Sequence, residues 1–460
     1  MTARSSLLLR SLREAVVTMV AALATMACTL AIDPEPGPAI LAVVLCLSLS
    51  RSQLDRSLRG RLEAAVSLPL VSLAALAVAM LLHQARWVGA GAFVLAISLS
   101  IWLRRFGPEG RKAGILIALP FVVILVTPYV QPKHLGTALA LMMPVIVALL
   151  ALFWVSVLHG LAQRWQWVPP SSPPSGPATP AITSTMRPMA STRMALQMAL
   201  ALAVSFVIGF VFFAERWAWI VLTAFIVSSG NQGRLDVVHK SLLRVLGAAG
   251  GTIAALTLAG SLPTHKAGAV SLMLAAIFVA VWLRPLGYGW WALFITLALA
   301  LLQGFNGAPT HDLLGLRLEE ILLGALIGIA AAWFVLPVRS TDVVRRRIAD
   351  TLAALGEAFD PALPDRSAAS FLAALDSVDK VAPAFRSLRL LTRKLSVVQP
   401  ADWVDELMAC REPAAALIEG GATPGRVRKA IGAARKAMRE PGEIQPALRD
   451  LRGSLLDTKI

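Results

Sequence analysis

The chain has 460 residues, of which 57% are hydrophobic and only 15% charged, and its formal net charge is +16. Soluble domains carry about 25% charged residues, so this composition excludes an ordinary soluble protein and indicates a chain solvated by a lipid bilayer. The Lys and Arg residues lie in short loops and in the C-terminal tail, which argues against nucleic-acid binding. Three cysteines without metal-ligand spacing give no sign of a zinc site or a disulfide framework.

The first half of the chain contains six apolar runs that we expect to be transmembrane helices, because a span in lipid must satisfy its own backbone. They are Glu14–Ile32, Ala39–Ser50, Leu62–Leu82, Trp87–Leu103, Ala113–Val130 and Thr137–Leu158. The first run follows Arg4, Arg10 and Arg13, as a signal peptide does. A matching run recurs inside the chain after Arg193, so we expect a retained helix.

Residues 163–190 are rich in Pro and Ser and predict an extended cytoplasmic linker between two transmembrane repeats, residues 1–162 and 191–337. The second repeat again contains six apolar runs. They are Arg193–Phe213, Trp217–Ser229, Val245–Leu262, Ala267–Leu283, Tyr288–Gln303 and Leu313–Leu336. Residues 338–460 mix charges of both signs with helix-like apolar spacing, and we expect a cytoplasmic helical domain of four or five helices.

An internal duplication relates the two halves. Residues 101–107 read IWLRRFG and residues 281–287 read VWLRPLG, roughly 180 positions later. Because each half has an even number of expected spans, the two copies run in the same direction through the membrane, as in transporters with parallel repeats. The predicted fold is all-α: a polytopic membrane protein with two parallel six-helix repeats, about twelve spans, and a C-terminal cytoplasmic helical domain.

The basic residues of the loops orient this topology. Arg86, Lys133, Arg216 and Lys266 fall on one side, and the other loop Lys and Arg residues gather on the opposite side. The basic side is cytoplasmic by the positive-inside rule, so we expect both termini in the cytoplasm. We expect the membrane to be the bacterial inner membrane.

The last expected span carries Arg317, Glu319 and Glu320 inside an otherwise apolar run. Ionisable groups within a span are costly and are functional candidates by default. One interpretation is that Arg317 attracts an anion and that Glu319 or Glu320 takes part in proton coupling; the other is a structural ion pair between Arg317 and Glu320. The corresponding positions of the first half are Ala138, Ala140 and Leu141.

Two glycine pairs predict close helix packing, because GxxxG spacing lets another helix approach. Gly324 and Gly328 follow Arg317 and Glu320 on one face of the last span, which we expect to point into the bundle. The second pair has a basic residue just before it. These residues are Arg244, Gly247 and Gly251. Arg244 is a further anion-path candidate, or a residue that serves only topology.

Two expected spans are short, Ala39–Ser50 and Trp217–Ser229, and occupy matching places in the two halves. Short or broken helices at matching places often mark a transporter's binding site, although polar flanks can equally extend such helices. Trp219, Ser229 and Asn231, in and after the second short run, are therefore candidates for the substrate path. The alternative for the tryptophan is an interfacial anchor.

Enzyme signatures are absent from the sequence: it has no Walker loop, HExxH, GxSxG or dinucleotide fingerprint. We therefore expect no catalytic residue, no metal and no cofactor. Transport by this chain would have to use an ion gradient or the gradient of the substrate itself.

Three segments resemble the fusaric-acid-resistance (FUSC) family, which includes the bacterial aromatic acid exporters. They are WAWIVLTAFIVSSGNQGR, RVLGAAGGTIAAL and RLEEILLGALIG, the last ending near Pro337. The resemblance is best over residues 190–340. It departs from the larger family members in having only the Pro-rich linker between the halves.

The resemblance implies an inner-membrane efflux protein for aromatic or related carboxylic acids, driven by the proton gradient. It also implies a periplasmic membrane-fusion protein as a partner, and oligomers as an option. A passive organic-anion channel of the same fold is the alternative. A non-transporting membrane scaffold or regulator is a third hypothesis, in which the C-terminal domain binds partners.

Overall fold

The computed structural model describes residues 3–51, 58–126, 137–168, 190–214, 216–259, 266–305, 310–362, 367–394, 398–421 and 425–457, and every regular element within these ranges is a helix. Contacts divide the chain into two units. The first comprises Met1–Ser171, Met186–Ser229 and Lys240–Leu336, and the second includes Gly230–His239 and Pro337–Ile460. The first unit contains helices of both halves of the sequence.

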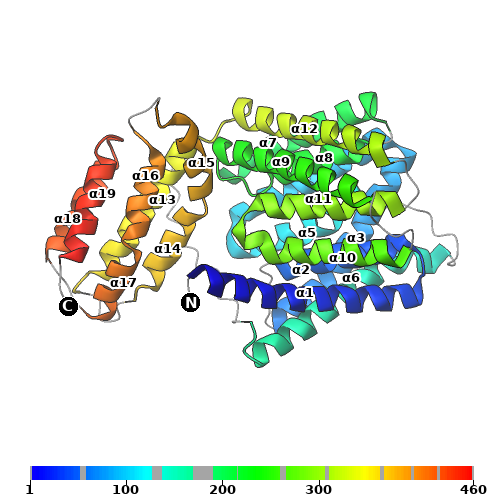
Figure 1. The fold of residues 1–460 in the computed structure, drawn as a ribbon, viewed down its shortest axis with the longest axis horizontal. Coiled ribbons are helices and arrows are strands. Elements are labelled where there is room, and N and C mark those ends of the chain that lie inside the picture. The colour runs from blue at the N-terminus through cyan, green and yellow to red at the C-terminus, as the bar shows by residue number, and fades with distance from the viewer. Residues whose placement is uncertain are drawn as a thin grey trace. The chain divides into compact units, whose positions relative to one another are not determined.

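The first unit is a helical bundle whose elements coincide with the expected apolar runs (Figure 1). Its helices in the first half are α1 (Ala3–Ile32), α2 (Pro36–Arg51), α3 (Leu58–Gln84), α4 (Arg86–Trp102), α5 (Gly107–Val126) and α6 (Thr137–Arg164). Those in the second half are α7 (Ala190–Phe212), α8 (Trp217–Ser228), α9 (Arg234–Ala259), α10 (Lys266–Leu283), α11 (Tyr288–Phe305) and α12 (Thr310–Phe334).

Seven helices of the described chain are long and apolar enough to cross a membrane: α1, α3, α4, α6, α7, α9 and α10. Three further apolar helices, α2, α8 and α11, are shorter. The helix α8 has only 12 residues, and α12 carries Arg317, Glu319 and Glu320, so neither meets a simple criterion of length and apolarity. The chain is a membrane protein, and the arrangement of twelve spans stays a prediction.

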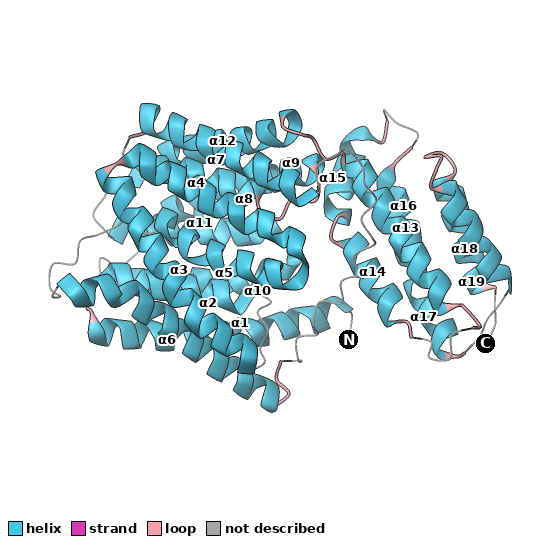
Figure 2. Ribbon diagram, turned by 180° about the vertical axis from the view of Figure 1, so that it is seen from behind, coloured by secondary structure: helices cyan, strands magenta, loops and turns pink. Residues whose placement is uncertain are grey.

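In each half of the bundle, the first, second and sixth helices of that half pack against one another. In the first half α1, α2 and α6 contact one another, and in the second half α7, α8 and α12 do so. Figure 2 shows α12 and α7 lying alongside one another. We call these sets the first triad and the second triad. Helices outside the triads contact them: α4 packs against α7 of the second triad, and α10 packs against α1 of the first triad.

The duplicated sequence motif takes a similar shape in both copies. IWLRRFG ends α4 and continues into a 3₁₀ turn, Leu103–Phe106, and VWLRPLG ends α10 and continues into a 3₁₀ turn, Arg284–Leu286. A glycine follows each turn, Gly107 with φ +82° and Gly287 with φ +153°. Glycine adopts positive φ at little cost, because it has no Cβ atom, and in each copy the next helix starts at or just after this glycine.

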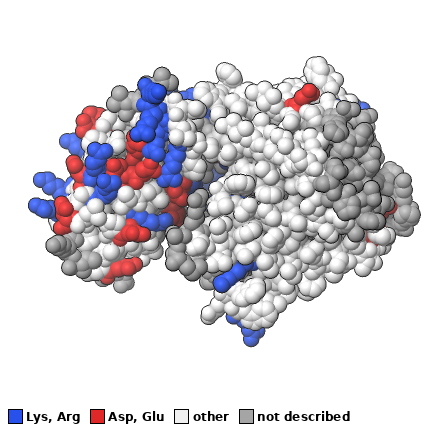
Figure 3. Space-filling model, in the orientation of Figure 1, with Lys and Arg blue, Asp and Glu red and all other residues white. Residues whose placement is uncertain are grey.

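On the face drawn in Figure 3, the first unit presents mostly uncharged residues, whereas the second unit displays many charges. Large apolar side chains of the first unit are exposed along its helices, including Leu95, Phe212 and Phe334 at 72%, 74% and 85%. A helix that presents apolar side chains outward and buries small residues inward is typical of a bundle that faces lipid.

The second unit contains seven short helices in its described C-terminal part, more than the four or five expected. They are α13 (Ser340–Ala358), α14 (Ala369–Asp379), α15 (Ala382–Thr392), α16 (Pro400–Ala409), α17 (Arg411–Glu419), α18 (Gly425–Ala437) and α19 (Ile444–Leu456). The expected number was wrong because Pro400 starts one helix and Gly420 ends another within what reads as continuous apolar spacing.

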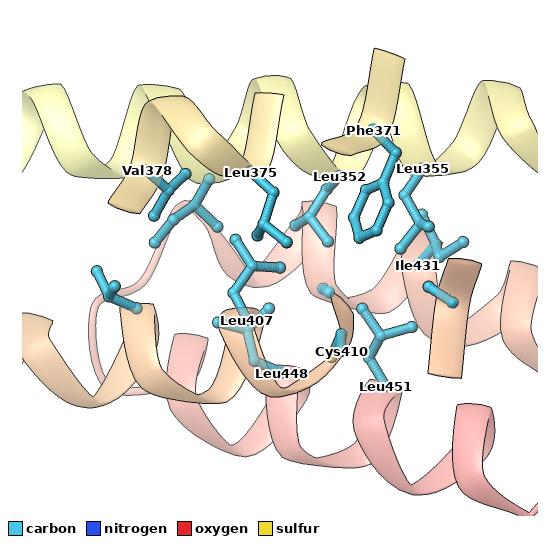
Figure 4. Packing of buried hydrophobic residues seen from close by; sticks show 14 of the residues in the cluster. Leu352, Leu355, Phe371, Leu375, Val378, Leu407, Cys410, Ile431, Leu448 and Leu451 are labelled. Carbon is cyan, nitrogen blue, oxygen red and sulfur yellow. The ribbon is translucent and has the colours of Figure 1, made fainter. Parts of the chain in front are cut away.

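A single apolar core holds these helices together (Figure 4). In α13 the buried residues Val344, Ile348, Leu352 and Leu355 recur at three- and four-residue spacing, which places them on one face. The other helices contribute facing side chains, among them Phe371, Leu375, Leu407, Ile431, Leu448 and Leu451. The core explains why residues 338–460 form helices although the individual segments are too short to be stable alone.

Candidate functional site

The second triad is built on an unusually close crossing of α8 and α12. A Cβ atom on Gly324 would lie 2.5 Å from the Ile220 carbonyl oxygen and 2.8 Å from Thr223 Cβ, and a Cβ on Gly328 would lie 3.3 Å from Ser228 Oγ. Only glycine permits such an approach at position 324. The face of α12 that carries these two glycines therefore packs against α8, inside the bundle.

Arg317 lies two turns before Gly324 on this same face. Its side chain is 2% exposed, and its guanidinium carbon lies 4.0 Å from the centroid of the Trp219 ring on α8. A guanidinium stacked on an indole face gains a cation–π interaction and keeps its N–H edge available for hydrogen bonds in the ring plane. Trp219 thus orients Arg317 in addition to packing within the bundle.

Glu320 is buried on α12, one turn after Arg317, and is 1% exposed. Its Oε1 atom lies 3.3 Å from Nε of Arg216, which immediately precedes α8. Glu319, its neighbour in sequence, is exposed. The structure thus distinguishes the two carboxylates: Glu320 points into the second triad and Glu319 away from it.

Arg244 reaches the same region from α9. It is 2% exposed, and its charge acts on Arg317 together with that of Glu320. A second close crossing positions α9: a Cβ on Gly247 would lie 2.6 Å from Ala292 Cβ, and one on Gly251 would lie 2.4 Å from the Leu293 carbonyl oxygen of α11. The two glycine pairs hold α9 and α12 at the crossings from which both arginines project.

Among the described residues, the buried charges of this cluster do not balance. Arg244 and Arg317 supply two buried guanidinium groups and Glu320 supplies one buried carboxylate. The other charges that act on Glu320, Arg216 and Glu319, are not buried. Burying like charges is costly unless a counter-charge offsets them. An anion of one negative charge would neutralise the cluster, and a carboxylate suits a guanidinium because both of its oxygens can accept N–H donors.

Sequence reasoning missed Arg216, which was assigned to the outer loops, and a set of buried hydroxyls. Among the described residues, Thr223, Ser241, Thr252 and Thr296 have hydroxyl oxygens with no hydrogen-bond partner. Ser and Thr in apolar helices ordinarily bond to a carbonyl of the preceding turn. Buried hydroxyls that do not are explained by water or by a ligand. Their signal in the sequence is a polar residue within a short or glycine-containing apolar run.

Two sequence candidates lie apart from this cluster. The Ser229 hydroxyl donates to the Phe225 carbonyl at 2.6 Å and thereby serves the end of its own helix. Asn231 is buried, but it belongs to the segment Gly230–His239, which groups with the C-terminal helices. No group of three or more His, Cys, Asp or Glu side chains suited to a metal ion was found in the part of the chain that the structure describes.

Comparison with known proteins agrees with the resemblance seen in the sequence. A family model described as Fusaric acid resistance protein-like matches residues 179–331, which include α7 to α11, most of α12 and the residues Arg216, Trp219, Arg244, Arg317 and Glu320. No curated protein and no solved structure matches the chain. Residues 179–331 are therefore similar to the fusaric acid resistance-like family.

Proposed function

We propose that this protein exports small organic anions, foremost aromatic carboxylates, across the bacterial inner membrane, driven by the proton gradient. In this proposal the chain crosses the membrane about twelve times as two parallel repeats. Both termini and the C-terminal helices lie in the cytoplasm, in accordance with the basic loops of that side. A periplasmic membrane-fusion protein and a second copy of the chain are partners that the proposal permits.

The excess of buried positive charge supports an anionic substrate more than any other observation. Arg317 and Arg244 come from different helices, and both are 2% exposed within an apolar bundle. Two like charges in such a place cost free energy that packing alone does not recover. A carboxylate bound between the two guanidinium groups would convert this cost into binding free energy.

Glu320 supports a role for protons. Its carboxylate contacts Arg216 at 3.3 Å and also acts electrostatically on Arg317, so it occupies the position of a resident counter-ion. A substrate carboxylate would compete with it for the same guanidinium groups. Protonation of Glu320 would remove that competition, so the protonation state of Glu320 would link anion binding to the proton gradient.

Transport by the purified full-length chain in liposomes tests the proposal. We expect an imposed pH gradient to drive radiolabelled benzoate against its concentration gradient, and Arg317→Ala to lower this flux strongly. Absence of gradient-driven movement for benzoate, other aromatic acids and aliphatic acids would sink the proposal.

Two alternatives give different outcomes in the same liposomes. A passive anion channel of the same fold is favoured by the same charge excess, and it would show a reversal potential that does not shift with pH. A scaffold or regulator would keep its function after Arg317→Ala and lose it when residues 340–460 are deleted.

A further inference from the structure

The start of α9 is built by the C-terminal helices. The first N–H groups of any α-helix have no partner within the helix and are ordinarily satisfied by a Ser, Thr, Asp or Asn directly before it. The residue before α9 is Gly233, which has no side chain to offer. The missing hydroxyl comes instead from Ser340, at the first position of α13: its Oγ accepts from the Leu235 N–H at 2.9 Å, across 105 residues of sequence.

The neighbouring donors are satisfied in the same way. The Arg234 N–H donates to the Val338 carbonyl at 3.2 Å, and the Asp236 N–H to the Gly233 carbonyl at 3.1 Å. Asp236 in turn accepts from the Gln232 N–H through its carboxylate at 3.0 Å, which ties the first turn to the residues that precede it. The N–H groups of the first turn of α9 are therefore satisfied partly by the residues just before α9 and partly by Val338 and Ser340 around the start of α13.

The contact between Gly233 and Ser340 leaves no room for a side chain. Gly233 has φ +121°, and a Cβ atom there would lie 2.7 Å from Ser340 Oγ and 3.1 Å from Ser340 Cα. Ser340 itself is 8% exposed. The hydrogen bond from the Leu235 N–H to Ser340 Oγ, which we call the trans cap, therefore requires a glycine at position 233.

A second set of contacts fixes the same segment. Arg347 on α13 donates to the Gln232 side-chain oxygen and to the Ser377 carbonyl on α14, and the charge of Asp236 acts on it. Burial lowers the pKa of Arg347, and Asp236 opposes that shift. Leu235 packs against the apolar core of the C-terminal helices. The segment Gly230–His239 is thereby an integral part of that unit.

The helix that begins here is the one that carries Arg244. Arg244 follows Arg234 by ten residues of uninterrupted helix, about 15 Å along the axis at 1.5 Å per residue. Buried residues recur at helical spacing between the two points, from Val237 through Ser241 to Arg244. An α-helix transmits rotation and translation of its end along its axis, because its backbone hydrogen bonds leave no soft joint in this stretch.

We propose that Ser340, Gly233 and Arg347 are positioning residues for anion transport: through the trans cap they set the rotation and depth of α9 and hence the position of Arg244. The C-terminal helices then act as part of the transport machinery, since a movement of α13 moves Arg244. This inference rests on the proposed function for its kinetic consequence, but its structural consequence can be measured without transport.

The test uses full-length protein in liposomes and compares Ser340→Ala and Gly233→Ala with two matched controls. Ser340→Thr retains the hydroxyl and is expected to restore wild-type behaviour. Gly230→Ala also alters a positive-φ glycine, at +59°, but has nothing within 4 Å of the new Cβ. Amide exchange in residues 234–237 reports the cap, and thiol labelling of an Arg244→Cys variant by a charged methanethiosulfonate reports the position of α9. Cys28 is replaced by Ser in this background because it is partly exposed and would also be labelled. Cys46 and Cys410 are buried and are kept.

We expect Ser340→Ala and Gly233→Ala to accelerate amide exchange, to change the labelling rate at position 244 by about fivefold and to raise KM for benzoate by a similar factor, as loss of a cap contributes about 1 kcal/mol. Vmax should change by less than KM. If exchange rises while labelling and KM stay at their wild-type values, or if exchange does not rise, the inference is wrong. If the wild-type chain moves no anion, the proposed function fails by itself and the labelling rate alone decides this inference.

Discussion

The first and second triads share one packing plan but differ in what they bury. The first triad, α1, α2 and α6, encloses an apolar core of small and aliphatic side chains such as Ala21, Ala42, Leu45 and Ala148. The second triad, α7, α8 and α12, encloses Arg317 and Glu320. Duplication supplied the same frame twice, and the positions of Arg317 and Glu320 are Ala138 and Leu141 in the first copy.

The polar groups of the two triads are satisfied differently. In the first triad the hydroxyls of Thr25 and Thr29 donate to carbonyls of their own helix at 2.8 Å, and the Cys46 thiol lies 3.2 Å from Thr25 Oγ1. In the second triad the buried hydroxyl of Thr223 has no such bond among the described residues. The first triad has one such hydroxyl as well, that of Ser50 near the end of α2, but the described residues of that triad include no buried arginine.

The largest effect should come from filling the crossing that makes the second triad possible. Gly324→Val would drive a branched side chain into the Ile220 carbonyl, 2.5 Å from the new Cβ, and cost about 3 kcal/mol or more by overpacking. The measurement is the fraction of monodisperse protein and its thermal unfolding in detergent. Gly315→Val on the same helix, with nothing within 4 Å, is the control. Equal behaviour of the two variants would show that α8 and α12 do not meet at Gly324.

The second largest effect should come from removing Arg317, the buried arginine that distinguishes the second triad from the first. Arg317→Ala is expected to lower the initial rate of benzoate transport by about tenfold or more, since a hydrogen bond to a charged group contributes about 1.5–3 kcal/mol. Arg317→Lys should recover only part of the rate, because lysine neither stacks on Trp219 nor binds a carboxylate with two donors. Arg10→Ala, at an exposed ion pair with Glu14, should leave the rate unchanged. An unaltered rate in Arg317→Ala would remove the anion site from this triad.

The two adjacent carboxylates allow a sharper comparison within one helix. Glu320→Gln keeps the side-chain shape but cannot release a proton, so transport should lose most of its dependence on the pH gradient while downhill exchange of anion persists. Glu319→Gln, one residue earlier and exposed, should behave as wild type. The readout is benzoate accumulation with and without an imposed gradient. Loss of coupling in the Glu319 variant, and not in the Glu320 variant, would reverse the assignment.

The smallest expected effect concerns a single hydroxyl. Thr223→Val is nearly isosteric and should lower the transport rate about twofold, in line with the loss of one hydrogen bond to water or anion, without lowering the unfolding temperature. Thr25→Val in the first triad removes a hydroxyl bonded to its own helix and should not change the rate. A fall in unfolding temperature for Thr223→Val would instead indicate a structural bond.

The helices of the membrane unit were largely predictable because long apolar runs end at Gly, Pro and charged residues. The expected spans Trp217–Ser229 and Ala267–Leu283 differ by one residue from α8 and α10. The two largest differences are at helix starts: α1 begins at Ala3, and α9 begins at Arg234. Apolarity marks the part of a helix that lies in lipid, and both helices continue beyond it as amphipathic turns.

The sequence predicted several individual residues of the site but not the contacts between them. Arg317, Glu320 and Arg244 were candidates because charge within an apolar run is rare. Arg216 was not, since a basic residue beside a span looks like any other topology signal. Its pairing with Glu320, and the separation of Glu320 from Glu319, depend on how α8 and α12 cross. One sequence does not contain that crossing angle, and it does not show that Ser340 completes a helix begun 105 residues earlier.

The shortness of α8 has a consequence for access. Its 12 residues rise about 18 Å, whereas the hydrocarbon core of a bilayer is about 30 Å thick. In the proposed twelve-span arrangement, at least one end of this helix would lie below the lipid surface, or the bilayer would thin locally to meet it, which costs a fraction of a kcal/mol per Å. Water would then reach that end of α8 within the depth of the membrane. A charged molecule would then shed its hydration shell across little more than half of the membrane's depth.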